Sequence, residues 1–196
     1  RRTNKCVFND DFFSTIDTEQ KAYWLGFITA DGNVHRDEST LQINLSAVDD
    51  GHLAKLAMIF RREVKSIKHS KTPMRYFSIY SKRLCGDLIQ LGVLPNKTDE
   101  DQSAIFNNVP NHLKRHFIRG LFDGDGSIAL SDKYKKHFTF AVIGEHRLMS
   151  EVANFICEKT GIRTPKIATE HRCSRIRWSG LYQCLAILEW LYDGSE

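Results

Sequence analysis

Apolar and polar residues alternate in four short stretches of the chain, residues 40–46, 76–80, 137–143 and 173–178. A period of two is typical of a strand with one face in the core and the other toward water. The inward positions are Leu41, Ile43, Leu45, Phe77, Ile79, Phe138, Phe140, Val142, Ile176 and Trp178. The outward positions are Thr40, Gln42, Asn44, Ser46, Tyr76, Ser78, Tyr80, His137, Thr139, Ala141, Arg175 and Arg177.

Other stretches repeat their apolar residues at helical spacing. Residues 49–60 and 145–156 each read as an amphipathic helix with an acidic first turn, and Asp49 and Asp50 favour the helix N-terminus there. Residues 82–92 and 179–191 show a second matching pair of helical patterns. The helices and strands therefore come in two similar sets.

The chain repeats itself directly. "AYWLGFITADGNV", residues 22–34, aligns with "HFIRGLFDGDGSI", residues 116–128, at an offset of 94 residues. Each half reads helix, two strands, helix, two strands, helix. We predict an α+β fold of two pseudo-symmetric αββαββα halves with mixed or antiparallel sheets, divided into residues 1–94, a polar connector at 95–112, and residues 113–196.

Small residues recur four apart on one face of each repeated helix, at Gly26 and Ala30 and at Gly120 and Gly124. Glycine inside a helix costs roughly 0.5–1 kcal/mol relative to alanine, so its use predicts a close approach of two backbones. We expect the two helices to pack on these faces. The glycines that follow, Gly32 and Gly126, read as left-handed helix stops.

Such packing would bring Asp31 and Asp125 together at two helix C-termini, where the helix dipoles already disfavour negative charge. A divalent cation would offset this repulsion. Hard cations such as Mg²⁺ prefer carboxylate, carbonyl and water oxygens, and pairs of them stabilise both oxygens in phosphodiester hydrolysis. The residues alone thus indicate a metal site between the two halves.

Composition adds limits. The chain has 196 residues, a net charge of +4 and 41% hydrophobic residues, and no stretch approaches the ~20 apolar residues of a membrane span. No basic segment followed by an apolar stretch opens the chain either, so we expect an intracellular protein that binds no membrane. The five cysteines show no metal-ligand spacing, so we expect reduced thiols. His112 and His116 lie one turn apart without a third ligand, which argues against zinc.

"WLGFITADG" (24–32) and "IRGLFDGDG" (118–126) resemble the two motif copies of the LAGLIDADG homing endonucleases, and the order of elements resembles their repeat. The resemblance covers nearly the whole chain from about Asp10. It implies a single-chain monomer whose two sheets form a saddle on double-stranded DNA with a long, largely asymmetric target. It further implies cleavage of both strands that leaves short 3′ overhangs.

The resemblance assigns the metal-binding acids to Asp31 and Asp125, with the backbone carbonyls of Ala30 and Gly124 as further ligands. It places a catalytic lysine at Lys82, and the corresponding place in the second half holds Ser179 or Gly180. The expected cofactor is Mg²⁺ or Mn²⁺, and Ca²⁺ is expected to bind without supporting turnover. The sixth motif position is Thr29 in one copy and Asp123 in the other, and it is not a metal ligand.

The outward strand faces and a basic hairpin tip predict the DNA contacts. These are Arg36, Gln42, Asn44, Tyr76, Ser78, Tyr80, Lys133, Lys135, Lys136, His137, Thr139, Arg172, Arg175 and Arg177. The alternative is a DNA- or RNA-binding protein that does not cleave, such as an intron maturase or a transcription regulator. Loss of either motif acid would favour that alternative, and both acids are present. A small-molecule enzyme is disfavoured because no nucleotide loop or nucleophile triad occurs.

Overall fold

The computed structural model describes residues 8–67, 72–95, 101–131, 137–170 and 173–194. The first half consists of α1 (Glu19–Asp31), β1 (Gly32–Val34), β2 (Thr40–Ser46), α2 (Asp50–Ile59), β3 (Lys65–Ser66), β4 (Met74–Tyr80) and α3 (Lys82–Leu91). The second half consists of α5 (Lys114–Asp125), β5 (Gly126–Ser131), β6 (His137–Gly144), α6 (His146–Thr160), β7 (Lys166–Glu170), β8 (Cys173–Ser179) and α7 (Leu181–Tyr192). The predicted αββαββα order is confirmed in both halves.

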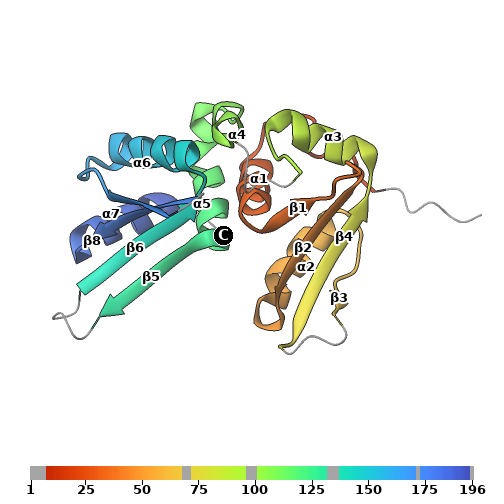
Figure 1. Cartoon of the computed structure of the whole chain (residues 1–196), viewed down its shortest axis with the longest axis horizontal. Helices are drawn as coiled ribbons and strands as arrows, with labels where there is room; N and C mark the ends of the chain where they lie inside the picture. Colours follow the sequence, from red (N-terminus) through yellow and green to blue (C-terminus); the bar gives the residue numbers. More distant parts are fainter. Residues whose placement is uncertain (1–7, 68–71, 96–100, 132–136, 171–172, 195–196) are drawn as a thin grey trace, which may run out of the picture.

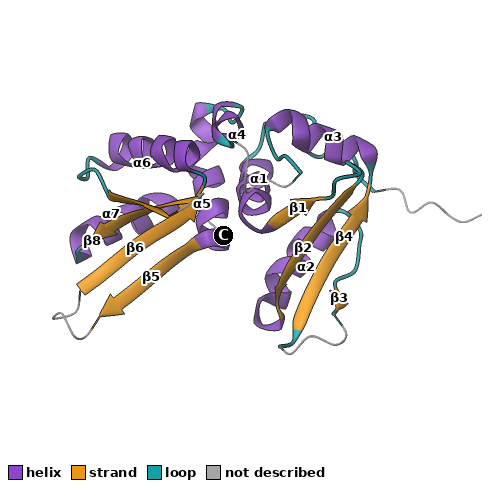
Figure 2. Ribbon diagram, in the orientation of Figure 1, coloured by secondary structure: helices purple, strands orange, loops and turns teal. Residues whose placement is uncertain are grey.

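Each half contains one four-stranded sheet, ordered β1-β2-β4-β3 in the first and β5-β6-β8-β7 in the second. All the strand pairings described are antiparallel, which decides between the mixed and antiparallel alternatives. α1 and α5 stand side by side at the centre, and the sheets extend to either side of them (Figure 1, Figure 2). The two sheets therefore frame the lower ends of the central helices.

The alternating pattern places the core correctly. Leu41 pairs with Ile79 and Ile43 with Phe77, and all four side chains are buried beneath the first sheet. In the second sheet, Phe140 pairs with the buried Trp178. One outward prediction was wrong: Ala141 is buried, because its short methyl group stands in register between Ser127 and the much longer side chain of Arg177.

The two central helices touch through their backbones. A Cβ atom added to Gly26 would stand 2.0 Å from the carbonyl oxygen of Phe117, and one added to Gly120 would stand 1.9 Å from that of Tyr23. Phe117 follows Tyr23 by the same 94 residues that separate the two glycines. The contact is therefore reciprocal, and each glycine admits one carbonyl of the opposite helix.

The glycines after the helices were misinterpreted as left-handed stops. Gly32 has φ −76° and Gly126 has φ −90°, both in extended conformations that any residue adopts. Glycine is needed there for space: added Cβ atoms would stand 2.5 Å from the Ile28 carbonyl oxygen and 2.1 Å from the Phe122 ring. Each helix consequently runs into its strand without an intervening turn.

The segment between the halves is more structured than a polar connector. It contains α4 (Ser103–Asn107) and a 3-10 turn at Asn111–Leu113. Phe106 is buried, and its ring lies 5.8 Å from that of Phe117 and 5.6 Å from that of Phe155. α4 thus fills one flank of the seam between the two halves.

Two further expectations concern thiols and membranes. Cys85, Cys157, Cys173 and Cys184 are free thiols, and Cys85 and Cys184 are buried; Cys6 lies outside the described residues. In the described part of the chain, none of the helices has both the length and the apolar character that crossing a bilayer requires.

The backbone contact predicts opposite effects for two glycine-to-alanine changes. Gly26→Ala should lower the free energy of unfolding by about 1–3 kcal/mol or more, because its methyl group would push α1 and α5 apart. Gly86→Ala, inside α3 with no atom within 4 Å of an added Cβ, should raise it by about 0.5–1 kcal/mol. Urea unfolding of both variants measures this, and equal shifts would contradict the contact.

Candidate active site and nucleic-acid interface

The two motif acids occupy the C-terminal ends of the crossing helices. Asp31 is half-buried and Asp125 is exposed. A Cβ atom on Gly124 would come within 3.0 Å of the Asp31 carboxylate and 2.4 Å of the Ala30 methyl carbon. The acid of the first motif therefore lies against the second motif, at the seam between the two halves.

Each of the two acids lines a hollow of its own, and each hollow is also lined by a residue of the opposite motif. The hollow of Asp31, about 570 Å³, is also lined by Gly124, and that of Asp125, about 230 Å³, is also lined by Ala30. In each hollow the acid that precedes the next helix adds another carboxylate, Asp49 beside Asp31 and Glu145 beside Asp125, and Asp123 adds a third to the hollow of Asp31. Oxygen donors from both halves thus gather at the ends of α1 and α5.

The side chains at these helix ends supply only some of the ligands that a hard cation needs. Within the described ranges, no three side chains of His, Cys, Asp or Glu are grouped closely enough to hold a metal ion. Asp31 and Asp125 would therefore share a cation with carbonyl, water or phosphate oxygens, and Mg²⁺ is commonly bound through one or two carboxylates in this way. Ala30 and Gly124, in the last helical turns, are the carbonyl donors nearest to these acids in sequence.

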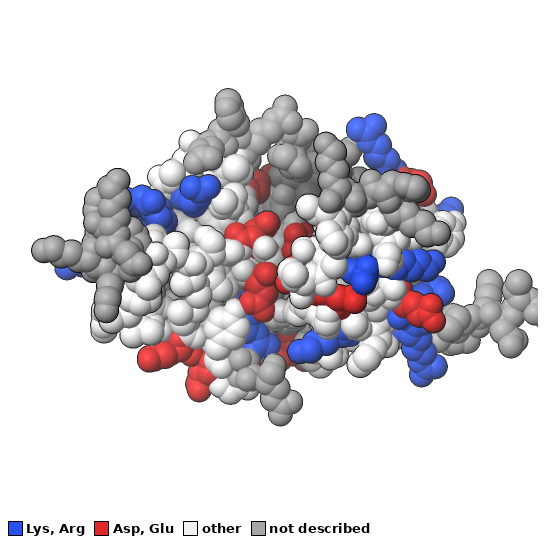
Figure 3. Space-filling model, turned by 90° about the horizontal axis from the view of Figure 1, so that it is seen from below, with Lys and Arg blue, Asp and Glu red and all other residues white. Residues whose placement is uncertain are grey.

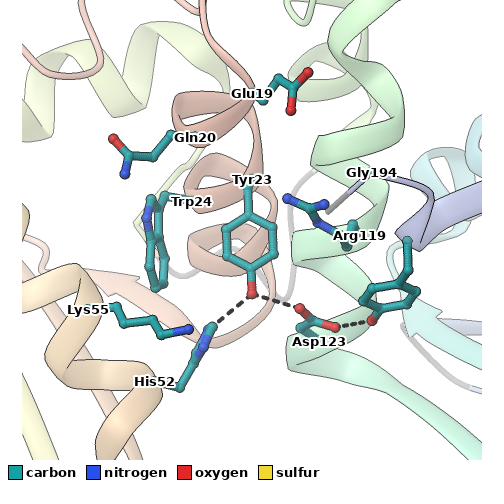
Figure 4. A pocket seen from close by; sticks show the side chains of 10 residues that line it. Glu19, Gln20, Tyr23, Trp24, His52, Lys55, Arg119, Asp123 and Gly194 are labelled. Atoms are coloured by element: carbon teal, nitrogen blue, oxygen red, sulfur yellow. Dashed lines mark hydrogen bonds between the residues drawn. The ribbon is translucent and has the colours of Figure 1, made fainter. Parts of the chain in front are cut away.

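A hydrogen-bond network that the sequence did not predict lies beside the acids (Figure 4). The hydroxyl of Tyr23 donates to Asp123 Oδ2 at 2.7 Å, and the hydroxyl of Tyr192 donates to Oδ1. Tyr23 also lies 3.1 Å from His52 Nε2. Because the Tyr23 proton is directed at Asp123, His52 donates to the phenol oxygen. The network joins helices of both halves.

Burial determines the protonation of this network. Burial, and then the hydrogen bond to Asp123, raise the pKa of Tyr23 and of Tyr192 well above the usual tyrosine value, so both phenols stay protonated. Burial lowers the pKa of His52, although the nearby Asp123 charge opposes that shift. Arg119 lies 5.1 Å over the Tyr23 ring and adds a cation beside Asp123.

The structure does not bring Lys82 beside Asp31. Lys82 begins α3 directly after β4, whose last residue, Tyr80, pairs with Thr40. Gly32, next to Asp31, pairs with Ile43 in the middle of β2. At about 3.3 Å per residue, Lys82 lies on the order of 15–20 Å from Asp31 along the sheet. The catalytic role expected of Lys82 stays a prediction, which this position after β4 does not favour.

Most predicted contact residues of the first sheet share one face. Gln42 pairs with Ser78, Asn44 with Tyr76 and Thr40 with Tyr80, so these side chains form one polar surface away from the core. Gln42 donates to Asn44 at 2.9 Å. Arg36 is exposed in the turn after β1.

The second sheet presents exposed Arg175 and Arg177 on β8, with Thr139 half-buried on β6. Lys166, also exposed, pairs with Arg177 and extends this basic surface. The remaining predicted contacts, Lys133, Lys135, Lys136 and Arg172, lie outside the described residues, as does the side chain of His137. Viewed from below, acidic side chains gather near the middle of the molecule and basic ones mostly lie farther out (Figure 3).

No protein-family model matches the chain, and no curated protein matches its sequence. Solved structures do match its fold. The N-terminal LAGLIDADG domain of DUF199/WhiA matches with a TM-score of 0.56 and 18% identity, over 97% of this chain and 93% of that chain. I-SmaMI, bound to an uncleaved DNA target in the presence of calcium ions, matches with a TM-score of 0.58 and 11% identity, over 89% and 84%.

The LAGLIDADG homing endonuclease I-LtrWI bound to target DNA matches with a TM-score of 0.53 and 11% identity, over 94% of this chain and 84% of that chain. At these identities the similarity shows the fold. The chain has the two-repeat LAGLIDADG fold, which confirms the resemblance first seen in the two nine-residue motifs.

Two histidines, the half-buried His52 and the buried His116, predict how stability depends on pH. Burial lowers the folded-state pKa of His52 and His116 below the usual value of 6.5, so protonation favours the unfolded chain. The free energy of unfolding should be constant above pH 7 and fall as the pH drops from 7 to 5. Urea unfolding across this range measures the slope, which should be shallower in His52→Gln and in His116→Gln than in the parent; equal slopes would contradict the burial effect.

Proposed function

We propose that this chain is a site-specific double-stranded DNA endonuclease that hydrolyses phosphodiester bonds with a divalent metal, Mg²⁺ or Mn²⁺. The observation that carries the proposal is the crosswise placement of Asp31 and Asp125 at the ends of α1 and α5, between two sheets with exposed polar faces. The similarity to structures of I-SmaMI and I-LtrWI bound to DNA supports it.

The acids would act as metal ligands. Two carboxylates at two helix C-termini repel each other and the helix dipoles, so a bound cation stabilises an arrangement that is otherwise unfavourable. When bound, the metal supplies Lewis acidity to the scissile phosphate and lowers the pKa of a coordinated water. Asp31 and Asp125 would position the cation between the halves. Each half would then cleave one DNA strand, and the two cuts together would leave a short 3′ overhang.

The sheet faces would hold the duplex. Arg175, Arg177 and Lys166 supply phosphate contacts on the second sheet, and Gln42, Asn44 and Tyr80 supply polar contacts on the first. Bare carboxylates repel phosphates, so metal ions would lie between the acidic middle of this face and the DNA backbone. The two sheets carry different side chains, so we propose a long, asymmetric target bound by a monomer.

The second candidate is a nucleic-acid-binding protein that does not cleave. Two observations favour it: the WhiA domain, which shares the fold, is named without reference to a nuclease, and the described residues offer no group of three metal-binding side chains. Both motif acids are nevertheless present and lie at the seam. A cleavage assay on substitutions of those acids distinguishes the two candidates.

Asp31→Asn and Asp125→Asn should each abolish metal-dependent cleavage and retain most of the DNA affinity, because asparagine keeps the shape but not the charge. The measurement is cleavage of targets selected from a random DNA library, with Mg²⁺ and with a chelator. Asp37→Asn, an exposed acid in the turn after β1, is the matched control and should cleave as the parent does. Full activity in both motif variants, or cleavage by the parent without divalent metal, would refute the mechanism; binding without cleavage would establish the second candidate.

DNA affinity should fall with salt because phosphate contacts release counterions, with a log-log slope of about −0.9 per neutralised phosphate. Arg175→Ala and Arg177→Ala should each weaken binding and make this slope shallower by about 0.9 for each phosphate that is no longer neutralised. Arg83→Ala, an exposed arginine on α3 that pairs with Asp11 at 3.7 Å, is the control and should change neither. Filter binding at several salt concentrations measures both quantities, and three identical slopes would show that β8 does not face the phosphates.

A further inference from the structure

Another hollow lies at the opposite end of α5 from the motif acids. It has a volume of about 410 Å³ and is enclosed by residues of α1, the turn at Asn111–Leu113, α5, α6 and α7. His116, on its wall, precedes Asp125 by nine residues, or about 13 Å along the helix axis. Glu19, at the top of Figure 4, is shared between this hollow and the pocket of the Tyr23 network.

The most informative residue is His116, whose exposed fraction is 4%. The equivalent position in the first half is Ala22, which is fully buried, so the fold itself does not require a polar side chain there. His116 Nε2 lies 3.4 Å from Glu19 Oε1, and within the described part of the chain its Nδ1 has no hydrogen-bond partner. Such an unmet buried nitrogen costs on the order of 1–3 kcal/mol. Because this nitrogen is also shielded from solvent, the His116 ring forms part of the closed wall of the hollow.

Cations and aromatic rings line the rest of the hollow. Arg115 and Lys159 are basic side chains, and His112 and Asn111 add further polar groups. Trp190 forms one wall, and its ring lies 6.2 Å from that of Phe155. Arg115, Lys159 and Trp190 also line an adjoining hollow, so the two cations stand between two neighbouring spaces.

We propose that this hollow binds a phosphate monoester joined to an aromatic ring, the chemistry of a nucleoside monophosphate or of a phosphorylated strand end. Arg115 and Lys159 would bind the phosphate, and Trp190 would stack on the ring. The volume lies within the range of small-molecule pockets.

The charge balance favours a single phosphate group. Arg115 and Lys159 contribute two positive charges, and Glu19 contributes one negative charge at the rim, where its side chain is 65% exposed. Lys159 also pairs with Glu158 at 2.8 Å, and Glu189 and Asp193 line the adjoining hollow with the same cations, which limits the positive potential further. A triphosphate would therefore meet too little compensating charge. The proposal is independent of cleavage, because the hollow lies away from Asp31 and Asp125.

The test uses the fluorescence of Trp190, since the chain's other two tryptophans, Trp24 and Trp178, are buried. Titration of the full chain with adenosine monophosphate should give a saturable change that inorganic phosphate reverses and that adenosine alone does not reproduce. Arg115→Gln and Lys159→Gln should each weaken binding by about tenfold, as expected for removal of a charge-assisted hydrogen bond. Lys65→Gln, an exposed lysine on β3, is the control and should bind as the parent does.

A 5′-phosphorylated tetranucleotide and its unphosphorylated form distinguish the two ligand sources. Preference for the phosphorylated tetranucleotide over the mononucleotide assigns the hollow to strand ends, and the reverse assigns it to free nucleotides. Absence of a saturable signal with every phosphorylated probe, equal affinity for adenosine, or unchanged affinity in both cation variants would overturn the proposal. Arg115→Lys, which retains the charge, separates impaired recognition from local unfolding, because Arg115 also donates to the Trp190 carbonyl at 3.4 Å.

Discussion

The reciprocal contact of Gly26 and Gly120 is the constraint on which the rest of the structure depends. Each glycine admits a carbonyl oxygen of the opposite helix, so α1 and α5 are held at one height relative to each other. A slip of one helical turn would displace one helix by about 5.4 Å and press a side chain against a carbonyl. Because both helices lead directly into β1 and β5, the same contact places the two sheets and the two motif acids.

Several negative charges lie at the C-terminal ends of α1 and α5. Asp31, Asp123 and Asp125 lie within the last turns of two helices whose dipoles disfavour negative charge. The structure treats these acids differently. Asp123 has both carboxylate oxygens bound by phenols, so its charge is stabilised by the protein itself. Asp31 and Asp125 line hollows at the seam, and Asp123 also lines the hollow of Asp31, where its two bound oxygens link the helices of both halves.

The repeated elements, their buried faces and the central helix pair could be predicted from the sequence. The periodic apolar residues and the spacing of small residues that indicate them can be recognised within short stretches of chain. It did not predict what depends on register or on contacts between distant segments. Lys82 follows a strand whose direction becomes known only from its pairing with β2. Tyr23 and Asp123 are 100 residues apart, and nothing in either motif indicates their hydrogen bond. The polar composition of residues 95–112 likewise concealed the buried Phe106.

The two inner strands differ in length, since β1 spans Gly32–Val34 and β5 spans Gly126–Ser131. Three additional residues extend a strand by about 10 Å, which equals roughly three base-pair steps of duplex DNA at 3.4 Å each. If both sheets lie along one duplex, the inner strand of the second half reaches about three base pairs farther from the pseudo-symmetry axis. The footprint on such a duplex would then be longer on one side, with a centre displaced from the point where the helices meet.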